Sequence, residues 1–291
     1  MRPDATRRSA LLGVAAVAVG TPLSALAAER GDRGLAALEA RSGGRLGVYA
    51  RCGRHVLQHR ADERFPMCSS FKFLLAARIL SDADRGLTDL NEAVLIPRSA
   101  LLSHAPVTQP AAEAGRPLSV EALCAAVVTV SDNTAANLLL ARVAGPAGLT
   151  RWLRAYDPKT RLDRLEPELN ESRNGDPRDT TTPEWMARDI ETFMTGDALS
   201  KNARAKLLRW MTDCTTGLNK LRAGAPAGWA VADKTGNNGV HTSGDVALLT
   251  RPDGARVFVA AYVTQSTLRG AAQEAIFADV ARLVTAKFAR G

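Results

Sequence analysis

The chain of 291 residues is 46% hydrophobic and carries a formal net charge of +8, from 38 basic and 30 acidic side chains. This length and composition exclude a disordered or fibrous protein and predict a globular chain of one large domain or two lobes. The basic residues are dispersed among acids without a basic block or interleaved aromatic side chains, so no nucleic acid partner is expected.

Residues 1–27 are typical of an export signal peptide. A basic segment precedes an apolar stretch over 10–19, and small residues at Ala25 and Ala27 suit cleavage by a signal peptidase. The stretch is shorter than the about 20 apolar residues that a membrane span needs, so no membrane insertion is expected after processing. Two adjacent arginines before it resemble a twin-arginine signal, with Sec export as the alternative. We therefore expect a periplasmic or secreted protein.

Apolar periodicity predicts the elements in chain order. A helix over 35–40 precedes Gly43-Gly44, and 45–53 alternates like a half-buried strand whose hairpin partner is 55–60. The middle of the chain is helical, with helices expected over 69–81, 119–130, 134–143, 147–155, 183–194 and 199–213. Strands return over 228–236, 243–251 and 255–265, and a last amphipathic helix is expected over about 269–288.

Strands from both chain ends would pair, which predicts an α/β fold with an antiparallel five-stranded sheet flanked by helices, plus an all-helical lobe. We assign 28–64 and 214–291 to the α/β lobe and 65–213 to the helical lobe, with the ligand site in the cleft between them. The long irregular segment over 161–179 predicts an ordered Ω-type loop. Its side chains that we expect to be buried are Leu162, Leu165 and Leu169.

A serine and a lysine stand three residues apart in an otherwise apolar run. Ser69 and Lys72 would share one helix face, and a lysine whose pKa is lowered by burial could accept the serine proton and leave Oγ nucleophilic. Taken alone, this pattern is more often a helix N-cap followed by a snorkelling surface lysine.

Two further polar triplets follow along the chain. In the first, Ser131 could relay a proton to a leaving nitrogen and Asn133 could donate to a substrate amide, although Ser-Asp-Asn also suits the junction of two helices. In the second, Lys234, Thr235 and Gly236 end a predicted strand. A cation, a hydroxyl and a residue without a side chain suit an anionic substrate along a strand edge, and an ordinary strand end is the alternative.

The three motifs occur in this order at separations of about 60 and 100 residues, and together they resemble those of the serine penicillin-recognising enzymes. Within the long loop, 166–170 reads EPELN and matches the ExxxN pattern of class A β-lactamases, a loop that penicillin-binding transpeptidases lack. A serine acyl-enzyme persists unless a base activates water. The resemblance implies that Glu166 is this base and that Asn170 holds the water.

The resemblance also implies roles for the other matched positions. Ser69 is the nucleophile, Lys72 shares the base work with Glu166, and Ser131 protonates the ring nitrogen. The backbone N–H groups of Ser69 and Asn237 form the oxyanion hole. The residues expected to bind substrate are His104, Asn133, Asn170, Lys220, Lys234, Thr235, Gly236 and Asn237.

Around the loop, the resemblance implies that Arg164 and Asp179 form a clamp between its ends and that Asn137 pins it from the neighbouring helix. The usual aromatic residue at the mouth of the cleft is replaced by His104, which would stack on substrate or be a plain surface histidine. The four histidines show no metal-ligand spacing, so neither a metal nor another cofactor is expected.

The chain departs from the family pattern at the substrate carboxylate and at its cysteines. The usual arginine is absent, since its two expected places hold Lys220 and Ser243, and either Lys220 or Arg222 is expected to substitute. Cys68 and Cys124 match halves of family disulfides, but the partner positions hold other residues. We therefore predict that no native disulfide forms among the cysteines Cys52, Cys68, Cys124 and Cys214.

The sequence thus predicts an exported bacterial class A serine β-lactamase, a monomer without cofactor. It would hydrolyse the β-lactam amide of penicillins and cephalosporins through a serine acyl-enzyme and so confer antibiotic resistance. The alternatives are a DD-peptidase or transpeptidase with the same motifs, and a β-lactam sensor that persists as the acyl-enzyme.

Overall fold

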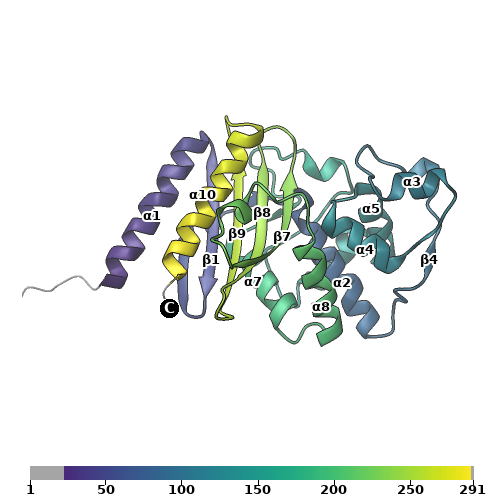
Figure 1. Ribbon diagram of the computed structural model, residues 1–291. Helices are drawn as coiled ribbons and strands as arrows, with labels where there is room; N and C mark the ends of the chain where they lie inside the picture. The colour runs from purple at the N-terminus through teal and green to yellow at the C-terminus, as the bar shows by residue number, and fades with distance from the viewer. Residues whose placement is uncertain (1–22, 290–291) are drawn as a thin grey trace, which may run out of the picture.

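The computed structural model describes the backbone of residues 23–289 and the side chains of residues 33–289 (Figure 1). Most of the predicted signal peptide therefore lies outside the described residues. The described remainder begins with a helix, α1 (Leu23–Ser42), which extends further toward the N-terminus than the predicted 35–40 because the preceding alanines and leucines favour helix. Within the described residues, no helix is long and apolar enough to cross a bilayer.

A five-stranded antiparallel sheet lies at the centre of the molecule, as predicted (Figure 1). Its strands are β1 (Arg45–Cys52), β2 (His55–His59), β7 (Ala230–Asn237), β8 (Ser243–Thr250) and β9 (Arg256–Thr264), in the order β2-β1-β9-β8-β7. The two ends of the chain meet where β1 pairs with β9, with Tyr49 opposite Ala260. Because both faces of the sheet are covered, β8 is buried along nearly its whole length, and its apolar residues follow one another without alternation over 246–249.

Helices cover both faces of this sheet. On one face, α1 and α10 (Gly270–Phe288) pack with the short α9 (Leu221–Gly224) around an apolar cluster that includes Leu35, Val259 and Phe277. On the other face, α7 (Pro183–Thr195) lies against β1, β8 and β9 and joins a larger cluster that continues into the helical part of the chain. Two of the three sequence motifs lie in this helical part, over 69–72 and 131–133, and the third lies on β7.

The helical part surrounds α2 (Lys72–Asp84), most of whose side chains are buried. Its other members are α3 (Thr108–Glu113), α4 (Val120–Thr129), α5 (Asn133–Arg142), α6 (Gly145–Leu153) and α8 (Lys201–Thr212). Four helices begin at side-chain N-caps that accept a backbone N–H three residues on, at Ser119, Asp132, Thr182 and Ser200.

The structure differs from the sequence prediction in several short elements. The helix expected over 69–81 begins as a 3₁₀ turn, η1 (Cys68–Phe71), and the α-helix starts at Lys72. The other elements not predicted are too short to show a period: α3, α9, η2 (Arg98–Ala100), η3 (Glu168–Asn170), and the pairs β3 (Phe65–Pro66) with β6 (Thr180–Thr181) and β4 (Ala93–Val94) with β5 (Leu118–Ser119).

The segment 161–179 is an ordered loop, but one of its three leucines is not buried. Leu162 and Leu169 are buried, whereas Leu165 is 44% exposed. The prediction for Leu165 is therefore wrong. The reason is that the polar contacts of the neighbouring Arg164 and Glu166 set the course of the backbone here, and they leave the intervening side chain toward solvent.

Candidate active site

The predicted motifs converge on a cavity of about 280 Å³ between the end of β7 and the helical part of the chain. The site residues expected from sequence that line it are Ser69, His104, Ser131, Asn133, Asn170, Lys220, Thr235, Gly236 and Asn237. Lys72, Glu166 and Lys234 are buried beside it, where they contact the residues that line it.

Ser69, Lys72 and Glu166 form a compact group of polar atoms. The Ser69 hydroxyl donates to Glu166 Oε1 over 3.3 Å, and the Lys72 ammonium lies 2.9 Å from the same oxygen, with both charged side chains fully buried. The alternative of a snorkelling surface lysine is therefore wrong. Burial lowers the pKa of Lys72, and the negative charge of Glu166 opposes this shift.

Lys72 also links the two helical motifs, because its Nζ donates to the Ser131 carbonyl over 2.8 Å and to Asn133 Oδ1 over 2.5 Å. Ser131 has a φ of 62°, in the left-handed region that non-glycine residues rarely adopt. In this conformation its hydroxyl accepts from Lys72 at 3.4 Å and from Lys234 at 3.2 Å. Burial lowers the pKa of Lys234 to about 8.

Asp132, the middle residue of its triplet, has a structural role. Its buried carboxylate caps α5 by accepting from Ala135 N and also accepts from the backbone of Val107 and Thr108. The helix-junction interpretation of Ser-Asp-Asn therefore applies to Asp132, while its two neighbours face the site. One triplet serves both purposes.

Gly236 lets strand β7 approach η1, the turn that carries Ser69. A Cβ built at this position would lie 2.3 Å from the Met67 carbonyl oxygen and 3.0 Å from Ser70 N. The residue without a side chain was expected to admit a ligand, whereas in the structure the backbone of Met67 and η1 occupies the space that a Cβ would need. The end of β7, with Asn237, consequently lies beside Ser69.

The structure distinguishes the two candidates for the carboxylate cation. Lys220 lines the cavity and donates to Ser243 Oγ over 2.8 Å, with Gly236 and Gly244 carbonyls also in reach. Arg222 instead binds the buried Asp233 and the carbonyls at the end of α8. Arg222 does not line the cavity. Burial lowers the pKa of Lys220, opposed by the negative charge of Asp245.

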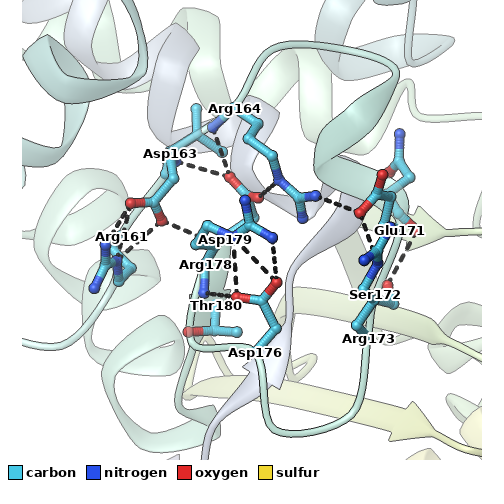
Figure 2. A network of polar contacts seen from close by, with 12 residues as sticks. Arg161, Asp163, Arg164, Glu171, Ser172, Arg173, Asp176, Arg178, Asp179 and Thr180 are labelled. Carbon is cyan, nitrogen blue, oxygen red and sulfur yellow. Dashed lines mark hydrogen bonds and ion pairs between the residues drawn. The ribbon is translucent and has the colours of Figure 1, made fainter.

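The loop that carries Glu166 is held at both ends by charged groups (Figure 2). Arg164 Nε donates to Asp179 Oδ2 over 2.6 Å, and Asp179 Oδ1 also accepts the backbone N–H groups of Asp163 and Arg164. Asp163 in turn accepts from Asp179 N and from the guanidinium of Arg161. The clamp is thus a network of side chains and backbone, with Asp179 almost fully buried at its centre.

Within the loop, two asparagines position Glu166. Asn137 of α5 donates to the Glu166 carbonyl over 2.9 Å and accepts its N–H over 3.0 Å. Asn170 Nδ2 donates to Glu166 Oε2 over 2.5 Å. The buried Asn170 Oδ1 accepts no hydrogen bond from residues 33–289, so it is available to a small polar ligand such as water.

His104 lies at the mouth of the cavity, and its Nε2 contacts the Val130 carbonyl over 3.0 Å. Two residues of the cavity were missed by sequence reasoning. Thr216 exchanges a hydrogen bond of 2.6 Å with the hydroxyl of Thr235, and Glu274 lines the wall near Lys220. Neither residue belongs to a motif, so the sequence carried no signal for them.

All four cysteines are free thiols. Cys68, next to the nucleophile, is buried with its Sγ 3.5 Å from the hydroxyl of Ser172, and burial raises its pKa to about 12. In residues 33–289 no three His, Cys, Asp or Glu side chains are grouped so as to hold a metal ion.

Comparisons with known proteins agree on one family. Residues 32–288 match the model of the Beta-lactamase enzyme family. The chain is 42% identical to Beta-lactamase L2 of Stenotrophomonas maltophilia, over 92% of this chain and 86% of that one. It is 40% identical to Beta-lactamase AST-1 of Nocardia asteroides, over 87% of this chain and 82% of that one.

Solved structures give the same result. An ancestral (GNCA) class A β-lactamase is 46% identical with a TM-score of 0.85, covering 89% of this chain and 99% of that chain. A β-lactamase from Xanthomonas campestris is 42% identical with a TM-score of 0.88, covering 90% of this chain and 98% of that chain.

Proposed function

The chain belongs to the class A serine β-lactamases and hydrolyses the β-lactam amide, conferring antibiotic resistance, and on this premise we propose how its residues divide the work. Ser69 attacks the β-lactam carbonyl. Its proton passes to Glu166 Oε1, the atom to which its hydroxyl already donates, and the Lys72 ammonium on the same oxygen stabilises the charge. The backbone N–H groups of Ser69 and Asn237 bind the developing oxyanion.

Collapse of the tetrahedral intermediate requires a proton for the ring nitrogen. Ser131 supplies it, because its hydroxyl lies in the cavity and contacts two ammonium groups that can replace the proton, those of Lys72 and Lys234. The C–N bond breaks, and the opened drug stays attached to Ser69 as an ester. Lys220, Lys234 and Thr235 hold the substrate carboxylate during this step.

Hydrolysis of the ester releases the product and restores the enzyme. Glu166 first passes the proton taken from Ser69 to the Lys72 amine, which lost one through Ser131 and lies 2.9 Å from Oε1, and so returns to the carboxylate. It then removes a proton from a water bound beside Glu166 and the free Asn170 Oδ1, and the water attacks the acyl carbon. As the ester breaks, Glu166 returns that proton to Ser69 Oγ. The observation that carries the proposal is the position of Glu166, whose Oε1 contacts both Ser69 and Lys72 while its Oε2 contacts Asn170.

The test is Glu166→Ala, followed by intact-mass spectrometry after mixing with benzylpenicillin. We expect a stable adduct of one drug per chain and a kcat lower by about 10²- to 10⁴-fold, the usual contribution of a general base. The matched control is Glu168→Ala, which removes an exposed carboxylate two residues away and should turn over at the parent rate. If Glu166→Ala hydrolyses penicillin as fast as the parent, another group is the deacylating base.

We also infer that the protein acts outside the cytoplasm as a monomer. Support comes from the predicted signal peptide over 1–27 and from bacterial relatives that are themselves β-lactamases. The drug target, the cell wall, is made outside the cytoplasm, so hydrolysis there protects it.

A further inference from the structure

Two carboxyl groups lie buried against each other beneath the start of the Glu166 loop. Asp157 follows α6, Asp189 lies on α7, and their carboxyl groups lie close enough to interact directly. Both residues are almost fully buried, and in each the Oδ2 atom meets no donor from residues 33–289. Two ionised carboxylates in contact would repel strongly at this depth, because there is little water to screen them.

We propose that Asp157 and Asp189 share one proton, and that this proton holds the turn from which the Glu166 loop departs. The proton belongs on Asp189, which then donates to Asp157. Asp157 is the better carboxylate, since its Oδ1 already accepts the backbone N–H groups of Lys159 and Thr160 over 2.5 and 3.0 Å. The Oδ2 atom of Asp189, by contrast, meets no donor from residues 33–289.

The surroundings of the pair favour the neutral acid. The charged or titratable groups that face Asp189 are Asp157 and Arg154, from the segment that ends α6, and Tyr262 of β9. Tyr262 is neutral in its buried position, and the side chain of Arg154 is on the surface, where water screens it. Burial and the charge of Asp157 together raise the pKa of Asp189 well above its ordinary value.

The turn at Asp157 leads directly into the loop. The Asp157 carboxylate orders Lys159 and Thr160 by accepting their backbone N–H groups. The Thr160 hydroxyl then contacts that of Thr181 over 2.6 Å, and Arg161 N donates to the Thr180 carbonyl. These contacts join the two ends of the loop one step before the Arg164–Asp179 clamp. Asp189 is therefore a positioning residue for Glu166, a role that rests on the function proposed for Glu166 above.

The shared proton predicts that the stability of the fold decreases as pH rises. A carboxyl with a raised pKa in the folded protein binds its proton more tightly there than in the unfolded chain, so stability falls as pH rises from the ordinary aspartate pKa toward the folded pKa. Asp189→Asn keeps a donor toward Asp157 without needing a proton. At about pH 5, the melting temperature of Asp189→Asn should therefore be equal to or below that of the parent. As pH rises, the difference between the two melting temperatures should shift in favour of Asp189→Asn, by about 3 °C or more by pH 8.

The control for this measurement is Asp213→Asn, which changes an exposed aspartate at the end of α8 and should leave the pH dependence unchanged. A difference between Asp189→Asn and the parent that is flat with pH would overturn the shared proton. Asp157→Asn provides a second route, since it removes the other acid and should flatten the same pH dependence. These melting curves do not depend on Ser69 or Glu166, so they stand even if the proposed mechanism fails.

The role of Asp189 in positioning Glu166 is tested by measuring kcat in two substitutions of Asp189. Asp189→Ala removes the donor, and we expect kcat for benzylpenicillin to fall about tenfold at pH 7, with acyl-enzyme accumulating, because a small displacement of the base is costly. Asp189→Asn should restore kcat to within about twofold. If Asp189→Ala folds and keeps the parent kcat, or if Asp189→Asn is as slow as Asp189→Ala, the positioning role is wrong.

Discussion

At the scale of single residues, the site concentrates positive charge where water is scarce. The buried cationic side chains among residues 33–289 are Lys72, Lys220 and Lys234, and all three lie around one cavity. Burial lowers the pKa of each of them. Buried ammonium groups cost free energy in the empty site, and an anionic substrate offsets that cost when it binds.

Lys220 provides the test of this idea, since it stands where the family usually has an arginine. Lys220→Met keeps much of the side-chain length and removes the charge. We expect KM for benzylpenicillin to rise about 10- to 100-fold, the usual effect of losing a charged hydrogen bond, with kcat within a few-fold of the parent. Steady-state kinetics on the drug and on its methyl ester measure this.

The ester is the matched control because it has no carboxylate charge. The effect of Lys220→Met should largely vanish with it. An equal rise in KM for drug and ester would show that Lys220 supports the strand ends through its contacts with Ser243 and Gly244 and does not read the carboxylate.

At the scale of elements, the loop over 161–179 owes its order to its ends. The β3–β6 pair, the Thr160–Thr181 contact and the Asp179 network close it, while Leu162 and Leu169 anchor it to the core. Closure of this kind confines a long segment whose own secondary structure within the loop is little more than the single turn η3. The general base is thereby held on a rigid support.

The prediction at this scale concerns Asp179. Asp179→Asn leaves Arg164 without a carboxylate partner and the N–H groups of Asp163 and Arg164 with a weaker acceptor. Breaking such a buried pair costs about 3 kcal/mol, and the acyl-enzyme should live longer because Glu166 is less well placed. Urea unfolding and the rate of loss of the acyl-enzyme mass measure the two effects.

Its control is Asp176→Asn in the same loop. Asp176 pairs with the exposed Arg178, and surface pairs of this kind contribute little to stability. Equal destabilisation by the two substitutions would contradict the distinction between a buried clamp and a surface pair.

At the scale of the whole molecule, two apolar clusters lie on opposite faces of one sheet, and the polar site lies at the end of β7, beside the second cluster. Three of the four thiols belong to this buried interior, and Cys52 alone is partly exposed. The thiols therefore report on the packing of the whole chain.

Intact-mass spectrometry of the exported protein after alkylation checks these expectations together. The mature chain should begin at Ala28, and non-reducing denaturation should expose four alkylatable thiols. Without denaturant only Cys52 should react quickly, because the other three are buried and burial raises the pKa of each. A count of two after denaturation would indicate a disulfide, and a mass including residues 1–27 would exclude the proposed cleavage.

Much of this organisation was readable from sequence. Strong periodicity predicted the five strands and the long helices other than the first part of α1, because burial of one face imposes a repeat that the chain itself displays. Spaced motifs predicted Ser69, Lys72, Ser131 and Lys234, and ExxxN predicted Glu166 and Asn170, which the structure brings into mutual contact. These are local or ordered patterns along one chain.

Other features exist only in the folded molecule. The choice of Lys220 over Arg222, the membership of Thr216 and Glu274 in the cavity, and the exposure of Leu165 depend on which distant segments meet. Gly236 was noticed in sequence, but the Met67 carbonyl that excludes a side chain there comes from another element. The Asp157–Asp189 pair joins residues on separate elements without any motif. Desolvation and close approach are properties of three-dimensional neighbours, so tertiary structure alone decided them.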